Sequence, residues 1–237
     1  MYMDIERLLD NFKKYLLTGD IKDKIAKIIL FGSYAKKTAT ADSDIDILIF
    51  TVNGKDVENS LMDKAYEFMI EHNAPLEILT SSIDALFFQD YFVYNVTRYG
   101  VEVYSMEKEE IKRQVVKDII SLSEEYLESA KEVLDRNRIR LAIDAAYNAA
   151  ELAAKALILL KQDDIPGSHG AVVSLFGQLY VKTNEVAPEK GRKLHVALKL
   201  RNEARYKPNA LLTAENAQEV IGLAEGLIKI ISEKTIL

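Results

Sequence analysis

The feature that most constrains this 237-residue chain is a change of sequence pattern near Ser105. Residues 1–104 alternate helix-like segments with short β-branched runs, such as Ile25–Phe31 and Ile45–Phe50. Residues 105–237 instead contain one helix-like segment after another. Such a change is typical of a boundary between two domains. We therefore expect an α+β domain at residues 1–104 and an all-α bundle of about five helices at residues 105–237.

The first part of the chain predicts helices packed on a small mixed sheet. The expected helices are Asp4–Leu17, Val57–Glu71 and Ile83–Tyr99, and the further expected strands are Leu76–Leu79 and an edge strand at Val101–Tyr104. Asn53-Gly54 is expected to end the second strand. The third helix is rich in aromatic residues, which we interpret as an interface between the two halves: Phe87, Phe88, Tyr91, Phe92 and Tyr94.

The second part predicts a bundle built around one buried helix. The expected helices are Lys108–Leu134, Ile139–Leu160, Val172–Lys182, Pro188–Tyr206 and Thr213–Glu233, the last with Thr213 as its N-cap. The second of these is apolar almost all round. Its polar residues Asp144, Asn148, Glu151 and Lys155 are spaced so that they form one narrow stripe. This pattern indicates a central helix with one special face.

Composition excludes several classes of protein. The chain has 49% hydrophobic residues, which is enough for a sizeable core, and it has no cysteine. Disulfides, thiolate zinc sites and a cysteine nucleophile are therefore ruled out. A formal net charge of −6 argues against a surface that generally binds nucleic acid. Because we find neither a signal peptide nor an apolar run that could span a membrane, we expect a cytoplasmic protein that makes no membrane contact.

One stretch carries residues suited to phosphate and metal chemistry. Gly32-Ser33 follows the first strand, where backbone amides and the serine hydroxyl could receive phosphate oxygens. Asp44 and Asp46 are two residues apart on the next strand, so period-two alternation places both carboxylates on one face. Two close carboxylates repel each other unless a cation lies between them. Mg²⁺ fits, because it binds oxygen ligands and retains water and phosphate in its shell.

This stretch resembles the signature of the polymerase-β-like nucleotidyltransferase superfamily, a Gly-Ser turn followed by an Asp-x-Asp pair. The segment Ala-Thr-Ala-Asp-Ser-Asp-Ile-Asp at residues 39–46 is similar to the corresponding segment of minimal and kanamycin-type nucleotidyltransferases. The resemblance as a whole covers residues 25–80. It implies a third carboxylate on a neighbouring strand. Glu77 is the candidate, although many members of the family have Asp there.

The resemblance also implies roles for these residues. Asp44 and Asp46 would hold the nucleotide-bound metal ion, and Asp46 with Glu77 a second one, so that an acceptor hydroxyl could attack the α-phosphate. Lys36 is a further candidate for contact with the triphosphate. Simpler interpretations exist for each residue: the aspartates could be charges that protect a strand edge, and Lys36 and Glu77 could be ordinary solvated residues.

The helical half resembles the HEPN domain, over residues 107–235. The motifs are the alanine-rich run at residues 145–157, Ser168-His169-Gly170 and Arg201-Asn202-Glu203-Ala204-Arg205-Tyr206. Some HEPN domains are ribonucleases that use a His four to six positions after the Arg. This chain has no His in that window, so the mechanism lacks its proton-transfer group. Arg201, Asn202 and Tyr206 form either a binding face or a buried polar network.

These features predict an enzyme that transfers a nucleoside monophosphate, AMP from ATP, to an acceptor hydroxyl. The acceptor is either a small molecule or a protein tyrosine, and related nucleotidyltransferases act as antitoxins by modifying a Tyr of a HEPN partner. Tyr206 occupies the corresponding place here. We also expect a homodimer through the helical domain. The alternatives are a nucleotide-binding, dimerising regulatory module without turnover and, less favoured, a HEPN ribonuclease.

Overall fold

The computed structural model describes residues 4–40, 42–52, 54–88 and 90–235. The chain divides into two compact units, residues 1–114 and residues 115–237. We call these the N-terminal unit and the C-terminal unit. Helix α5 (Lys108–Asp135) continues from one range of residues into the other without a break. The domain boundary near Ser105 therefore stays a prediction.

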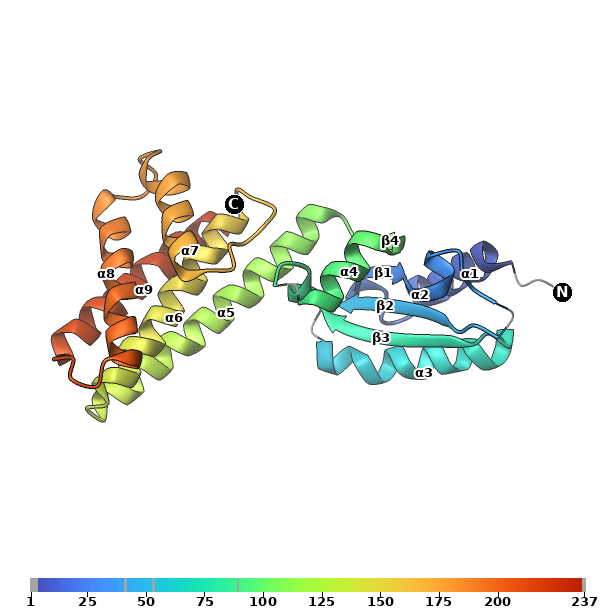
Figure 1. Ribbon diagram of the computed structural model, residues 1–237, viewed down its shortest axis with the longest axis horizontal. Coiled ribbons are helices and arrows are strands. Elements are labelled where there is room, and N and C mark those ends of the chain that lie inside the picture. The colour runs from blue at the N-terminus through green and yellow to red at the C-terminus, as the bar shows by residue number, and fades with distance from the viewer. Residues whose placement is uncertain (1–3, 41, 53, 89, 236–237) are drawn as a thin grey trace. The chain divides into compact units, whose positions relative to one another are not determined.

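Among the described residues of the N-terminal unit, four strands form one mixed sheet in the order β3-β2-β1-β4 (Figure 1). The strands are β1 (Ile25–Leu30), β2 (Ile45–Thr51), β3 (Leu76–Ser82) and β4 (Val101–Ser105). β1 pairs in antiparallel fashion with β2 and β4, whereas β2 and β3 are parallel. The predicted mixed sheet is confirmed, and Val101 begins an edge strand as expected.

Two amphipathic helices bury one face of this sheet. Helix α1 (Ile5–Thr18) contributes Phe12, helix α3 (Gly54–His72) contributes Phe68, and their rings meet edge to face at 5.0 Å between centroids. Both rings belong to the cluster that includes Ile47 and other residues of the sheet. The core cluster of the N-terminal unit therefore lies on the α1 and α3 side. On the opposite face of β2, Leu48 and Phe50 are also buried, and Asp46 is the partly buried residue. The expected end of β2 at Asn53-Gly54 lies partly outside the described residues.

The single helix predicted at Ile83–Tyr99 is wrong. The structure has a short 3₁₀ turn at Ile83–Leu86 and then helix α4 at Tyr91–Tyr99. The side chain of Asp90 accepts a hydrogen bond from the Val93 amide at 2.8 Å, so it acts as the N-cap of α4. A capping residue inside the expected helix therefore sets a new start. Gly100 follows α4 as expected, and its amide bonds to the Val96 carbonyl.

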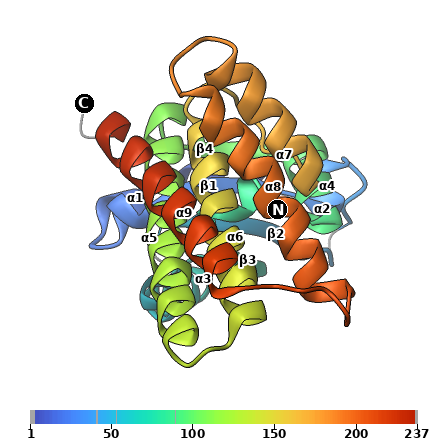
Figure 2. The ribbon, with the colours of Figure 1, turned by 90° about the vertical axis from the view of Figure 1, so that its left-hand side faces the viewer.

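The C-terminal unit is the predicted helical bundle. Its described helices, in addition to the end of α5, are α6 (Ile139–Leu159), α7 (His169–Phe176), α8 (Pro188–Tyr206) and α9 (Ala214–Thr235). Helix α6 lies among α7, α8 and α9, and packs against all three (Figure 2). It also receives a hydrogen bond from α5, because the Ser123 hydroxyl donates to the Ala149 carbonyl at 2.8 Å. The prediction of a central helix is confirmed.

The predicted helix Val172–Lys182 differs from the structure at both ends. Helix α7 begins at His169 because the Ser168 side chain caps it, accepting from the Ala171 amide at 3.3 Å. It gives way to a π-helical turn at Gly177–Val181. The expected cap at the start of α9 is confirmed, since Thr213 Oγ1 accepts from the Asn216 amide at 3.2 Å. No helix in the described part of the chain is both long enough and apolar enough to cross a membrane.

Candidate functional site

The turn after β1 lies directly against β2. The amide of Phe31 donates to the Asp46 carbonyl at 2.9 Å, and Gly32 follows with φ of +67°. A Cβ atom added at Gly32 would lie 1.8 Å from Asp46 Oδ2, which is far inside contact distance. The left-handed backbone and this close approach both require glycine. Two parts of the motif, separate in sequence, are therefore in contact at the end of β1.

Asp46 and Glu77 are neighbours across the parallel pair of strands. They occupy matching positions in the register of β2 and β3, and adjacent strands lie about 4.8 Å apart. Ile45 and Ile47 on either side of Asp46 are fully buried, whereas Asp46 is only partly buried and Glu77 is exposed. Alternation along a strand therefore places the two carboxylates on the same face, away from the α1 and α3 core.

The other predicted site residues lie around this pair. Asp44 is exposed and immediately precedes β2, rather than lying on the strand as the sequence predicts. Gly32 and Ser33 begin α2 (Gly32–Ala35), a single short turn of helix, and Ser33 is partly buried. Lys36 ends that turn and is exposed. The roles of these residues stay predictions.

The carboxylates near the start of β2 and β3 are of the chemical type that binds magnesium. Asp44, Asp46 and Glu77 offer carboxylate oxygens, and none of them forms an ion pair with a Lys or Arg in the described ranges. Within those ranges no group of three or more His, Cys, Asp or Glu is arranged to hold a metal. Mg²⁺, however, is commonly bound through one or two protein carboxylates, with water and phosphate oxygens completing its shell. The Asp46–Glu77 pair therefore suits a metal that arrives with a nucleotide.

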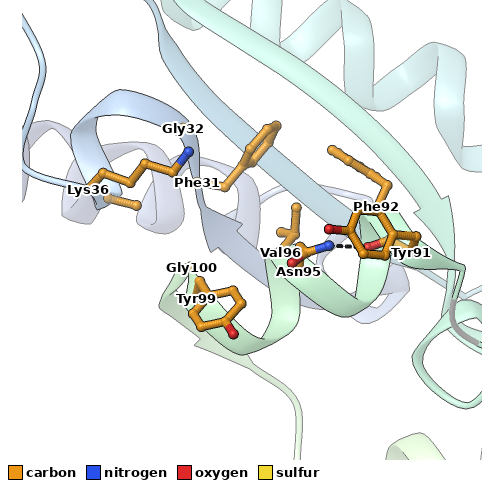
Figure 3. Close-up of a pocket in the computed structure, with 10 residues that line it drawn as sticks. Phe31, Gly32, Lys36, Tyr91, Phe92, Asn95, Val96, Tyr99 and Gly100 are labelled. Carbon is orange, nitrogen blue, oxygen red and sulfur yellow. Dashed lines mark hydrogen bonds between the residues drawn. The ribbon is translucent and has the colours of Figure 1, made fainter.

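A pocket of about 530 Å³ opens beside the Gly32 turn, between α2 and α4 (Figure 3). Gly32 and Lys36 lie on one side of it, and Tyr91, Phe92 and Asn95 of α4 lie on the other. Sequence reasoning missed this pocket, because we interpreted the aromatic residues near position 90 as an interface between the halves. The available signal was the concentration of aromatic residues on a helix that ends next to the glycine turn.

In the C-terminal unit, the predicted face of Arg201, Asn202 and Tyr206 contains a buried arginine. Arg201 on α8 is 6% exposed, and its Nε lies 3.4 Å from Asp144 Oδ1 on α6. Arg205 Nε lies 3.0 Å from the same oxygen. Arg201 also donates to Asn202 Oδ1 at 3.1 Å, and its guanidinium carbon lies 6.0 Å from the ring centre of Tyr206. This face therefore combines a buried polar network around Arg201 with the exposed side chain of Tyr206.

The polar stripe of α6 continues this network toward α7. The buried Glu151 bonds to His169 Nδ1 at 2.7 Å, and its other oxygen lies 3.9 Å from Lys155 Nζ. The His169 ring meets that of Tyr147 edge to face at 5.8 Å. Burial raises the pKa of the Tyr147 hydroxyl well above its ordinary value, and the charge of Glu151 adds to this shift. The sequence alone does not predict the hydrogen bond between His169 and Glu151.

The fold and the Gly32–Asp46 site indicate a protein with two domains, each of a known family. The model of the nucleotidyltransferase domain matches residues 9–141, and the model of the HEPN domain matches residues 116–234. Each match covers at least half of the chain. The chain therefore belongs to the nucleotidyltransferase family and carries a HEPN domain after the nucleotidyltransferase domain, as the two sequence resemblances imply.

Two curated proteins of Methanocaldococcus jannaschii are similar to parts of the chain. One, named as a candidate protein adenylyltransferase, is 32% identical over 102 residues, which are 43% of this chain and 100% of that protein. The other, named as a candidate toxin, is 32% identical over 113 residues, which are 48% of this chain and 83% of that protein.

Among solved structures, a nucleotidyltransferase-like protein from Exiguobacterium sibiricum is similar over 98% of this chain and 78% of its own. The sequence identity is 9% and the TM-score is 0.41.

Proposed function

We propose that this chain is a metal-dependent nucleotidyltransferase that transfers AMP from ATP to an acceptor hydroxyl. The observation that carries the proposal is the contact of the Asp46 carboxylate with the Gly32 turn, with Glu77 beside it in register. A triphosphate on the turn would have its α-phosphate close to both carboxylates. Ser33 and Lys36 are the further proposed phosphate contacts.

The proposed step is an in-line displacement at the α-phosphorus. The acceptor oxygen forms a bond to that phosphorus, the bond to the β-phosphate oxygen breaks, and pyrophosphate leaves. Glu77 is the proposed acceptor of the hydroxyl proton. Asp44 and Asp46 would hold one Mg²⁺ ion, and Asp46 with Glu77 a second. Mg²⁺, when bound there, would neutralise triphosphate charge and make the acceptor hydroxyl more acidic.

The proposed acceptor is a tyrosine hydroxyl of a protein. One relative is named as a candidate protein adenylyltransferase and another as a candidate toxin, and this chain carries a nucleotidyltransferase domain and a HEPN domain. Tyr206 is 69% exposed, so its side chain is accessible from solvent, as an acceptor must be. Arg201, the arginine of the HEPN motif, has its guanidinium carbon 6.0 Å from the centre of the Tyr206 ring.

Labelled ATP tests this proposal directly. The full chain is incubated with Mg²⁺ and α-labelled ATP, and its intact mass and its labelled peptides are then measured. We expect a gain of one AMP on the wild type and none on the Asp44→Ala/Asp46→Ala double variant. We expect Tyr206→Phe to abolish the label. The matched control is Tyr66→Phe, because Tyr66 on α3 has a similar exposure of 65%.

The variants separate the two parts of the proposal. A label that persists in the aspartate double variant would contradict the metal-dependent transfer. A label that persists in Tyr206→Phe would leave the transfer intact and move the acceptor elsewhere. ATP that is bound but never consumed, with any acceptor, would instead support a regulatory module.

A further inference from the structure

The pocket between α2 and α4 has the size and chemistry of a small-molecule site. Its volume of about 530 Å³ lies within the usual range for ligand pockets, roughly 300–1,000 Å³. Most of its wall is apolar or aromatic, with a lysine at one end and an asparagine among the rings. All of the lining residues belong to the N-terminal unit.

The pocket and the carboxylate site share a wall. Gly32 lines the pocket and is also the residue against which Asp46 Oδ2 lies. Phe31, the residue before it, meets the Phe92 ring of α4 edge to face at 5.6 Å. A ligand with phosphates on the Gly32 turn would therefore have its remaining part next to the rings of α4.

The aromatic side chains of the pocket are unusually exposed. Tyr91 is 84% exposed, Tyr99 66% and Phe92 43%, although all three line the same hollow. Aromatic rings beside a positively charged phosphate site are a common platform for nucleobases, because each base has a flat face that stacks on them. Lys36 at the rim supplies the positive charge.

Asn95 presents a defined hydrogen-bonding group in this pocket. Its side-chain nitrogen donates to the Tyr91 carbonyl at 2.6 Å (Figure 3). Because a carbonyl can only accept, the amide is oriented with its nitrogen there, and Oδ1 is the atom left for a ligand. Adenine offers an exocyclic amino group as a donor, whereas guanine has an acceptor oxygen at the same position.

We propose that this pocket binds the nucleobase of the nucleoside triphosphate and that Asn95 selects adenine over guanine. This inference rests on the proposed function, since it assigns the base to the same nucleotide. The rings of Tyr91 and Phe92 provide the stacking surface, and Asn95 Oδ1 accepts the adenine amino group. Occupation of the pocket by the acceptor molecule is the competing outcome.

Equilibrium binding of ATP, GTP and inorganic tripolyphosphate to the full chain in Mg²⁺ tests the inference. We expect the wild type to bind ATP more tightly than GTP or tripolyphosphate. Tyr91→Ala should weaken ATP binding roughly tenfold and leave tripolyphosphate binding unchanged. Asn95→Ala should bring ATP and GTP to nearly equal affinity. Tyr66→Ala, which removes an exposed ring of α3 outside the pocket, should change nothing.

The contrary results distinguish failure of the base pocket from failure of the proposed transfer. ATP binding that is unchanged in Tyr91→Ala and Asn95→Ala would overturn the base pocket and leave the proposed nucleotidyl transfer standing. Equal binding of ATP and tripolyphosphate by the wild type would do the same. A wild type that binds neither ATP nor tripolyphosphate would overturn both proposals. Because Tyr91 is largely exposed, its truncation should preserve the fold, and the thermal melting curve verifies this.

Discussion

At the scale of single residues, the transfer site depends on a backbone conformation that only glycine adopts easily. Gly32 has a positive φ and is in contact with the carboxylate of Asp46. The sequence predicted Gly32 as a phosphate contact. The structure adds a second role for this glycine. Because Gly32 has no side chain, the Asp46 carboxylate can lie against the turn. The residue therefore connects the proposed phosphate site with the proposed metal ligand.

Gly32→Ala should displace Asp46 and strain the turn. A Cβ 1.8 Å from Oδ2 forces the carboxylate to move, and a left-handed alanine costs roughly 1–2 kcal/mol. We expect a comparable fall in unfolding free energy in urea and a loss of nucleotidyl transfer. Gly170→Ala is the matched control, since an added Cβ there meets nothing within 4 Å apart from its chain neighbours and its own helix backbone. Equal behaviour of the two variants would contradict this interpretation.

The Arg201–Asp144 ion pair gives a second prediction at this scale. Asp144→Ala removes the carboxylate nearest to a buried guanidinium, so we expect destabilisation of about 3 kcal/mol, measured by chemical denaturation. Glu225→Ala breaks the Lys131–Glu225 pair, in which both side chains are 50% exposed. That variant should cost less than about 1 kcal/mol. A small effect in both variants would show that the buried network contributes little.

At the scale of elements, capping residues explain where prediction and structure diverge. Hydrophobic periodicity continues from Ile83 to Tyr99, so the sequence predicts one helix there. Asp90 interrupts it by capping α4 at Tyr91. Ser168 similarly starts α7 earlier than the apolar run indicates. One carboxylate therefore sets the start of α4, the helix that carries the aromatic wall of the pocket.

Asp90→Ala should loosen α4. Loss of the hydrogen bond to the Val93 amide is expected to cost about 1 kcal/mol and to speed amide hydrogen exchange in the first turn of α4. Asp90→Asn is the control, because asparagine caps helices about as well as aspartate. Hydrogen exchange followed by mass spectrometry measures both. If the Asn variant exchanges as fast as the Ala variant, the cap is not the cause.

At the scale of the whole molecule, each unit is stabilised by its own core and its own polar contacts. In the C-terminal unit, Glu185 joins two distant segments, because it pairs with Lys161 after α6 and lies 3.0 Å from Lys234 on α9. These two lysines lower the pKa of Glu185 from 4.5 to about 2. The homodimer and the domain boundary stay predictions at this scale.

The lowered pKa of Glu185 predicts a pH dependence of stability. Because the folded pKa lies below the unfolded value, the stabilisation is present above about pH 4.5 and is lost as the pH falls through about 2. The melting temperature of Glu185→Gln should therefore be below that of the wild type at pH 7 and converge with it near pH 2. Glu233→Gln, in a highly exposed pair with Lys229, should match the wild type throughout.

The sequence by itself determined the order of the four strands, the two families of the chain and the central place of α6. These depend on local periodicity and on short motifs, which are properties of neighbouring residues. The tertiary structure decided which distant residues meet: Asp46 with Gly32, Asp144 with Arg201, and α4 with the glycine turn. Such contacts depend on how helices and strands pack, and no local pattern encodes a close approach between segments that are far apart in the chain.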